Sequence, residues 1–170
     1  MKSKKNIVLI GMMGSGKSSI GRILSKELNI DFLDIDQKIE ESENLSISDI
    51  FKKYGENYFR NVEEKICLKL LKTENNVISL GGGGFINLSI RKLCKKTCLT
   101  FWLNWKNETI IKRIFKSKKR PLVTKLTKDQ INNLIKERSK IYELSDYKIN
   151  CDKLDKSQII NKIIDVYESK

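Results

Sequence analysis

Residues 11–18 have the composition and spacing of a phosphate-binding loop. Their sequence, GMMGSGKS, matches the pattern G-x-x-x-x-G-K-[ST], with an apolar run before it and an amphipathic segment after it. Glycines let backbone N–H groups turn toward phosphate oxygens, and the following helix adds its positive N-terminal end. Lys17 is placed to reach the β- and γ-phosphates, and the Ser18 hydroxyl to ligate Mg²⁺. The predicted nucleotide-binding residues here are Gly14, Ser15, Gly16, Lys17, Ser18 and Ser19.

Two carboxylates, Asp34 and Asp36, stand at the predicted end of the second strand. Side chains alternate along a strand, so both are expected on the same side. One is suited to assist Mg²⁺ through water, which that ion retains in most sites. The other is suited to accept a hydrogen bond from an acceptor hydroxyl and to act as its base. The alternative is that one of the two only caps the next helix.

A second glycine run and three arginines complete the candidate chemistry. Residues 81–84 are four glycines, whose N–H groups suit a carboxylate or phosphate unless the run is a plain flexible turn. Arg60, Arg120 and Arg138 suit bidentate binding of a carboxylate or phosphate. Arg120 lies in the basic segment 116–128, predicted to be a mobile lid that closes over the phosphates. The alternative for each arginine is a solvated surface position.

Short apolar runs alternate with helical patterns along the chain. The strands and helices that they predict must position the candidate site residues. Strands are expected at 6–10, 31–36, 76–80, 97–103 and 147–151, and helices at 17–28, 46–72 with a break near Gly55, 88–95, 108–115, 129–144 and 156–167. This alternation predicts a parallel sheet covered by helices on both faces, in one α/β domain of 170 residues. Ligands of such sheets bind at the carboxyl ends of the strands.

The composition limits the function classes. The chain has 34 Lys and Arg against 21 Asp and Glu, and it has no histidine, which excludes histidine catalysis and histidine metal sites. A net charge of +13 suits an anionic partner, either nucleotide phosphates or nucleic acid, although a generally lysine-rich composition also explains it. The four cysteines are expected to be buried thiols. No apolar run approaches the roughly 20 residues that span a bilayer, so a cytoplasmic chain is expected.

Taken together, the motifs resemble the shikimate kinase family over nearly the whole chain. The resemblance rests on GMMGSGKSSIGRILSKEL, FLDID, ISDIF, GENYFRNVEE, ISLGGGGF, KRPLV and ERSKIYELSD, in this order and at these separations. It implies a P-loop NTPase fold like that of nucleoside monophosphate kinases, a three-layer α/β/α arrangement with a five-stranded parallel sheet. It also implies transfer of the ATP γ-phosphate to the 3-hydroxyl of shikimate, in the chorismate route to aromatic amino acids.

The resemblance also implies roles for single residues. Lys17 and Ser18 match the phosphate-loop lysine and the magnesium ligand, and Asp34 matches the aspartate near magnesium. Asp36 matches the residue that holds the shikimate hydroxyls. The other matches are Arg60 and Arg138 for the shikimate carboxylate, Gly82 and Gly83 for backbone positions of the substrate pocket, Arg113 for packing near adenine, Arg120 for the lid arginine, and Phe51 and Phe59 for apolar pocket walls that could equally be core.

The chain departs from the family pattern in its fourth glycine, in Phe85 where a smaller residue is common, and in the lysine-rich segment 116–119. The expected organisation is a single kinase domain over 1–170, with an acceptor-binding region at about 34–62 and the lid at about 116–128. It is expected to act as a monomer on shikimate with ATP and Mg²⁺, without nucleic acid or membrane. The alternatives are another P-loop kinase, for a sugar acid or a nucleoside monophosphate, and a nucleic-acid-binding protein that contains a nucleotide site.

Overall fold

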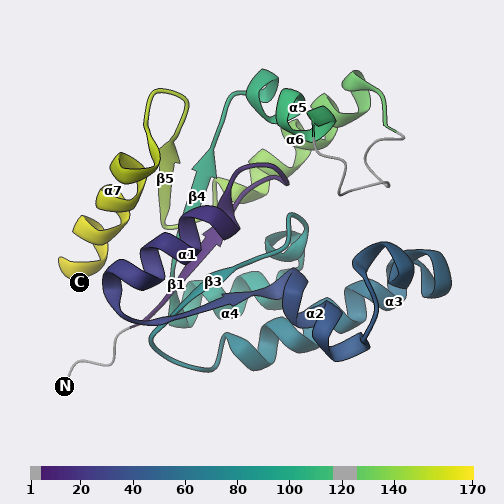
Figure 1. The fold of residues 1–170 in the computed structure, drawn as a ribbon, viewed down its shortest axis with the longest axis horizontal. Helices are drawn as coiled ribbons and strands as arrows, with labels where there is room; N and C mark the ends of the chain where they lie inside the picture. Colours follow the sequence, from purple (N-terminus) through teal and green to yellow (C-terminus); the bar gives the residue numbers. More distant parts are fainter. Residues whose placement is uncertain (1–4, 117–125) are drawn as a thin grey trace.

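A computed structural model describes residues 5–116 and 126–170 of the chain (Figure 1). In chain order its elements are β1 Asn6–Ile10, α1 Lys17–Leu28, β2 Asp31–Asp34, α2 Ile35–Glu43, α3 Ile47–Leu70, β3 Asn76–Ser79, the short 3-10 helix η1 Gly84–Ile86, α4 Leu88–Thr97, β4 Cys98–Asn104, α5 Asn107–Lys116, α6 Lys128–Tyr142, β5 Tyr147–Asn150 and α7 Lys156–Glu168. Most bounds differ from the expected ones by only a few residues. Of the predicted lid at about 116–128, residues 117–125 lie outside the described part of the chain.

The five strands form one sheet in the order β2-β3-β1-β4-β5, and every neighbouring pair is parallel. The carboxyl ends of all five strands therefore meet at one edge. Each of the first three strands leads there into a segment singled out in the sequence: the phosphate loop after β1, the aspartates after β2 and the glycine run after β3. The parallel α/β fold class is confirmed.

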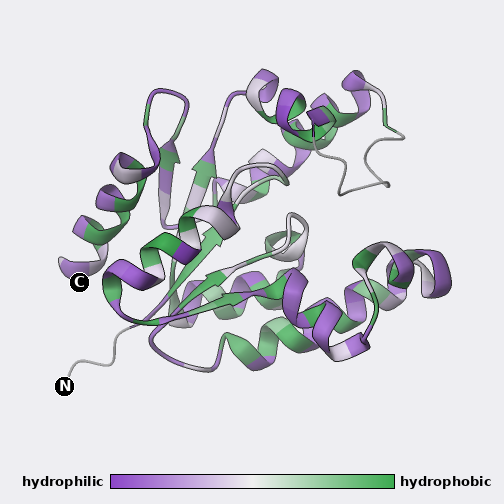
Figure 2. Ribbon diagram, viewed as in Figure 1, coloured by the Kyte–Doolittle hydropathy of each residue, from purple (hydrophilic) through white to green (hydrophobic). Residues whose placement is uncertain are grey.

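Helices cover both faces of this sheet, because successive strand side chains project to opposite faces and are apolar on both. Ile7 and Leu9 of β1 belong to a core that α1 and α7 complete, whereas Val8 and Ile10 belong to the core on the opposite face. Figure 1 shows α1 and α7 together on one face of the sheet. In Figure 2 the central strand β1 is largely hydrophobic, and the helices carry a hydrophobic stripe with hydrophilic residues beside it. These are the three layers that the sequence predicts.

The second strand is shorter than expected, and α2 was not predicted at all. The Asp34 side chain accepts hydrogen bonds from the backbone N–H groups of Asp36 and Gln37, at 3.1 and 3.4 Å. It therefore caps α2, and the chain turns into a helix directly after it. Asp36 lies in the first turn of this helix. The expectation that both carboxylates project from one strand is wrong, and the capping alternative holds for Asp34.

The predicted break near Gly55 is confirmed. Gly55 has φ 81° and ψ 176° inside α3, a conformation that side chains disfavour, so the helix is divided into two pieces at this glycine. Ser46 caps the first piece by accepting a hydrogen bond from the N–H of Asp49 at 3.1 Å. All four cysteines are free and buried, as expected. Within 5–116 and 126–170, no helix is both long and apolar enough to cross a membrane.

Asp146 ties β4 to the segment before β5, and we expect Asp146→Asn to destabilise the fold. Its carboxylate accepts hydrogen bonds from the N–H and hydroxyl of Thr100, at 2.9 and 2.7 Å, and from Lys95 Nζ. Losing hydrogen bonds to a charged group should cost about 2 kcal/mol near neutral pH, or about 4–8 °C in Tm. Thermal unfolding measures this loss, with exposed Asp165→Asn as the matched control, which should leave Tm within about 1 °C.

The difference between Asp146→Asn and the unchanged protein should depend on pH. Burial of Asp146 disfavours its charged form, but the hydrogen bonds from Lys95 and Thr100 outweigh this and leave its pKa below the ordinary value. Its contribution is therefore complete above the ordinary aspartate pKa and is lost as the pH falls below about 4, through the lowered pKa. Urea unfolding should show the two curves converging in that range. A gap that widened in acid would contradict this assignment.

Candidate active site

The phosphate loop connects β1 to α1 and is held from within by Lys17. Its Nζ donates to the carbonyl oxygens of Gly11 and Met12, at 2.8 and 3.0 Å, and the side chain is buried. Gly11 has φ 145°, and a Cβ there would lie 3.0 Å from the Leu103 carbonyl oxygen. The loop therefore needs glycine at position 11. The ammonium group of Lys17 lies within the curve of the loop, against these carbonyl oxygens.

Ser18 and Asp34 meet at the edge where β1 and β2 end. Ser18 Oγ donates to Asp34 Oδ2 at 2.5 Å, although the two residues come from different strand–helix connections. Two hard oxygen groups thus lie side by side next to the phosphate loop. Ser19, the next residue of α1, is exposed.

A cavity of about 730 Å³ opens beside the loop, at the same edge of the sheet. It is lined by most of the residues predicted for the acceptor side. They are Asp36 from α2, Phe51, Phe59 and Arg60 from α3, Gly82 and Gly83 after β3, and Arg138 from α6, with Met13 of the phosphate loop. Segments far apart in the sequence therefore form one pocket.

The phenylalanines of this pocket fit both interpretations left open by the sequence. Phe51 and Phe59 line the cavity, and their ring centroids lie 4.6 Å apart. Phe59 is also buried in the core, and Phe51 packs against it.

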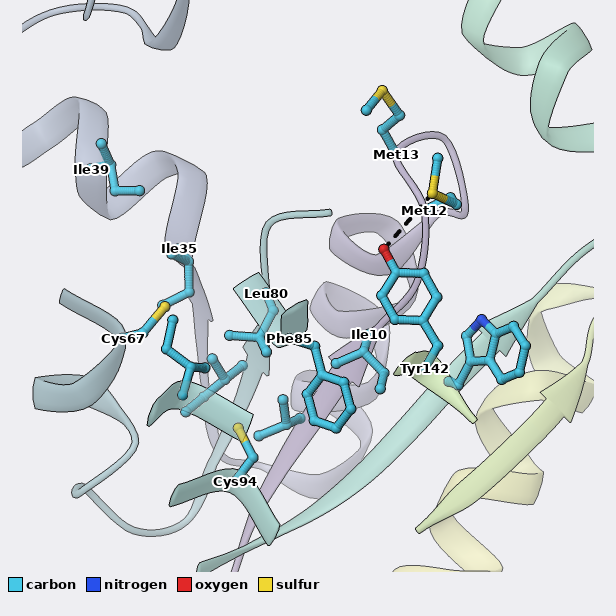
Figure 3. Close-up of a cluster of buried hydrophobic side chains, with 14 of the residues drawn as sticks. Ile10, Met12, Met13, Ile35, Ile39, Cys67, Leu80, Phe85, Cys94 and Tyr142 are labelled. Carbon is cyan, nitrogen blue, oxygen red and sulfur yellow. Dashed lines mark hydrogen bonds between the residues drawn. The ribbon is translucent and has the colours of Figure 1, made fainter. Parts of the chain in front are cut away.

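Phe85 stands where the family pattern commonly has a smaller residue, and the structure gives a reason for its size. It follows Gly84 in η1, and its side chain is buried in the core beneath the pocket, among Ile10 and Leu80 (Figure 3).

Arg60 is held by two carboxylates of its own helix. Its Nη1 donates to Glu63 Oε2 at 2.7 Å, and its Nε and Nη2 donate to Glu56 Oε1 at 3.3 Å. The Glu63 side chain is only 2% exposed. Burial raises the pKa of the Glu63 carboxyl, against the opposite effect of Arg60. A buried charge that fixes an arginine is an expensive arrangement, which is a reason to expect a function for it.

Sequence reasoning missed Glu63, although one signal was present. Phe59, Glu63 and Cys67 are buried at a spacing of four residues along α3. A glutamate inside such an apolar stripe is unusual unless it has a charged partner, and Arg60 stands three residues before it.

Two buried polar atoms at the cavity have no hydrogen-bond partner within 5–116 and 126–170. They are Glu63 Oε1 and Arg138 Nη1. Buried polar atoms in proteins are nearly always paired, so a polar ligand between these side chains is the expected partner. Arg138 thus offers a donor toward the pocket.

The glycine run follows the wall of the cavity closely. A Cβ on Gly82 would lie 3.4 Å from Arg138 Nη1, and one on Gly83 would lie 2.5 Å from Arg60 Nη1. The run is therefore more than a flexible turn, because both arginines approach its backbone. Gly84, the additional glycine, would make only ordinary contacts at 3.6 Å with a Cβ.

We expect Gly83→Ala to weaken acceptor binding. The new methyl group would push Arg60 away from Glu63, which fixes it at 2.7 Å. Losing one well-placed charged hydrogen bond should raise the acceptor KM by about tenfold and the ATP KM by less than about twofold. Steady-state kinetics measure both values, with Gly84→Ala as the matched control. An unchanged acceptor KM would show that Arg60 adapts freely.

Tyr142, also missed, connects the two loops. Its hydroxyl donates to the Gly82 carbonyl oxygen and lies 3.8 Å from Met12 Sδ (Figure 3). It is fully buried, and burial raises its pKa to about 12, so the phenol stays protonated and remains a donor. One side chain of α6 thereby supports the phosphate loop and the glycine run together.

Arg113 lies next to the phosphate loop, where its Nη1 donates to the Gly14 carbonyl oxygen at 3.3 Å. Its guanidinium covers the ring of Trp105, with 3.8 Å between Cζ and the ring centroid. The remaining predicted arginine, Arg120, lies outside the described residues. Within the described residues, no group of three or more acidic or cysteine side chains could hold a metal ion.

Comparisons with known proteins agree with this geometry. The family model described as shikimate kinase matches residues 13–168. A shikimate kinase of Sulfurihydrogenibium sp. is 42% identical over 160 residues, covering 94% of this chain and 96% of the relative. The crystal structure of shikimate kinase from Aquifex aeolicus is 39% identical with a TM-score of 0.86, covering 96% of each chain.

A third relative carries a ligand. The structure of shikimate kinase from Acinetobacter baumannii in complex with shikimate is 30% identical to this chain, with a TM-score of 0.90 and coverage of 97% of this chain and 93% of the other. With a family model covering most of its length and relatives of this identity, the chain belongs to the shikimate kinase family.

Proposed function

We propose that this chain transfers the γ-phosphate of ATP to the 3-hydroxyl of shikimate. The observation that carries the proposal is the cavity of about 730 Å³, in which Asp36 and two arginines line one pocket beside the phosphate loop. Shikimate is a small triol with one carboxylate, so it needs cations at one end and a hydrogen-bond acceptor at the other. The family membership supports the same reaction.

On the acceptor side, Arg60 and Arg138 bind the carboxylate. Arginine suits this group because its planar fork donates two parallel hydrogen bonds. Arg138 Nη1 has no hydrogen-bond partner among the described residues, and Arg60 approaches Gly83 closely, and both observations support this role. Asp36 accepts a hydrogen bond from the reacting hydroxyl and orients its oxygen, or removes its proton.

On the nucleotide side, the backbone N–H groups of the phosphate loop and the Lys17 ammonium hold the phosphates, with Ser19 at the outer side of the loop. Lys17 Nζ contacts loop carbonyls now, so it exchanges these partners for phosphate oxygens when ATP binds. Arg113 packs against adenine, since guanidinium groups stack on flat rings. The proposal for Arg120, closure over the transferred phosphate, rests on the resemblance alone.

A magnesium ion is part of the proposal, held by Ser18 Oγ and, through water, by Asp34. The site fits such an ion because both groups offer oxygen, which Mg²⁺ prefers, and they lie 2.5 Å apart. Mg²⁺ usually takes only one or two protein ligands beside waters and phosphates. When bound, it would neutralise developing charge on the phosphates.

A coupled assay of ADP release with a panel of acceptors tests the proposal. Shikimate should stimulate turnover, whereas nucleoside monophosphates and sugar acids should not. A folded, ATP-binding protein that shikimate fails to stimulate would overturn the proposal. Tight and steeply salt-dependent binding of DNA or RNA would instead favour the nucleic-acid alternative that the +13 charge suggested.

The remaining partner expectations stay predictions. They are a monomer, an absence of nucleic acid and membrane partners, and a cytoplasmic location. Sedimentation at micromolar concentration measures the first, and electrophoretic shift assays at physiological salt measure the second.

A further inference from the structure

Trp105, the residue that follows β4, is bonded to the phosphate loop. Its indole Nε1 donates to the Ser15 carbonyl oxygen at 2.9 Å. Ser15 itself is buried. Trp105 packs against the cores on both faces of the sheet, so its ring is supported from two sides. A side chain from the connection between β4 and α5 thus holds one carbonyl of the loop.

The same indole also carries Arg113, the residue proposed to face adenine. The guanidinium lies over the ring at 3.8 Å, the geometry of a cation–π contact, and its Nη1 donates to the Gly14 carbonyl oxygen at 3.3 Å. Gly14 has φ 79°, and a Cβ there would lie 3.4 Å from Arg113 Cβ. Two consecutive carbonyls of the loop are therefore held by one stacked pair of side chains.

Holding these carbonyls fixes the direction of the loop's donors. In a planar trans peptide the C=O and the following N–H point in opposite directions. With the Ser15 carbonyl bonded to Trp105, the N–H of Gly16 must point the opposite way, away from the indole. The preceding peptide is fixed at both ends, because the Ser15 N–H donates to the Met12 carbonyl oxygen at 3.1 Å. The loop is thus preset before a nucleotide arrives.

We propose that Trp105 is a positioning residue for nucleotide binding, acting through the Ser15 carbonyl and through Arg113. It orients a loop donor for the phosphates and fixes the plane of the guanidinium on which a purine stacks. Trp105 is absent from the lining of the acceptor cavity, so its effect is specific to the nucleotide. This inference rests on one part of the proposed function, the binding of ATP at the phosphate loop, and not on the identity of the acceptor.

Two replacements separate the two contacts. Trp105→Phe keeps a ring beneath Arg113 but removes the N–H donor, and it should raise the ATP KM by about fivefold. Trp105→Leu removes both contacts and should raise it by about twentyfold. The acceptor KM and kcat should stay within about twofold in both variants, since only ground-state binding of the nucleotide changes. Trp102→Phe, at the chain's other tryptophan, controls for general effects of losing an indole.

A double-mutant cycle tests the route through Arg113. Trp105→Leu, Arg113→Met and the double variant should be non-additive, so that the double variant binds ATP only about twofold more weakly than Trp105→Leu. Calorimetric binding of a non-hydrolysable ATP analogue supplies the affinities without any acceptor, so they remain measurable even if shikimate proves not to be the acceptor.

Three results would overturn the inference. The first is an unchanged ATP affinity in folded Trp105→Phe and Trp105→Leu. The second is a parallel rise of ATP and acceptor KM with a lowered Tm, which indicates a purely structural role. The third is full additivity with Arg113→Met, which would exclude the route through that arginine. If Trp105→Leu fails to fold, Trp105→Phe still decides whether the hydrogen bond to Ser15 matters.

Discussion

Replacing Asp36 with asparagine is expected to lower kcat by about two to four orders of magnitude. Asp36 lines the cavity from the first turn of α2, beside the glycine run, where a Cβ on Gly81 would lie 2.8 Å from its Oδ1. Asparagine keeps the size of the side chain but cannot take a proton, and it accepts hydrogen bonds only through its oxygen. Coupled ADP release measures kcat, and the ATP KM should change by less than about threefold.

The pH dependence of the same variant tests whether the ionised carboxylate of Asp36 is required. If it is, kcat/KM of the unchanged protein falls on the acid side and this limb is missing in Asp36→Asn. A limb that persists in Asp36→Asn belongs to another group. Asp31→Asn, an exposed aspartate at the other end of β2, is the matched control. Full activity in Asp36→Asn would exclude both proposed roles of the carboxylate, proton removal and orientation of the hydroxyl.

Replacing Lys17 with methionine should lower kcat by about three orders of magnitude or more, because a preorganised positive charge beside the transferred phosphate is lost. The buried ammonium sits 2.8 Å from the Gly11 carbonyl oxygen, inside the loop that is to hold the phosphates. Methionine is close in length to the lysine side chain but carries no charge and no hydrogen-bond donor. Single-turnover phosphoryl transfer with saturating ATP measures the chemical step apart from weaker binding.

Two controls distinguish a lost charge from a damaged loop. Lys26→Met removes a lysine from the exposed last turn of the same helix and should leave kcat unchanged. Circular dichroism should show that Lys17→Met remains folded, with shikimate binding retained by calorimetry. Retention of more than about a tenth of kcat would exclude Lys17 as a major stabiliser of transferred charge.

The local motifs were predictable because their physics lies within a few consecutive residues. The phosphate loop needs glycines, a lysine and a hydroxyl at fixed spacing between a strand and a helix, and β1 and α1 have the expected bounds. The break at Gly55 was equally visible, since a glycine with positive φ interrupts a helix by itself. The three layers were predictable for the same reason, since the alternation of apolar runs with helical patterns is also visible in short stretches of sequence.

The aspartate pair shows where local reasoning was insufficient. Strand alternation predicted two carboxylates on one side, but Asp34 caps α2 and contacts Ser18, whereas Asp36 lies in the first turn of that helix and lines the acceptor cavity. The two patterns are indistinguishable over three residues, because an aspartate is favourable both at a strand end and at an N-cap. The competition was decided by how the next nine residues pack.

Short-range spacing in the sequence is sufficient to predict the phosphate loop, the layered parallel fold and the residue types of the acceptor side. Which side chains meet depends instead on how the folded chain packs. This packing paired Arg60 with the buried Glu63, left Arg138 Nη1 without a partner among the described residues, and set Trp105 against the phosphate loop. The bond from Trp105 to Ser15 joins residues from different strand connections, and the Arg60–Glu63 pair owes its character to the burial of Glu63, which a linear pattern does not contain.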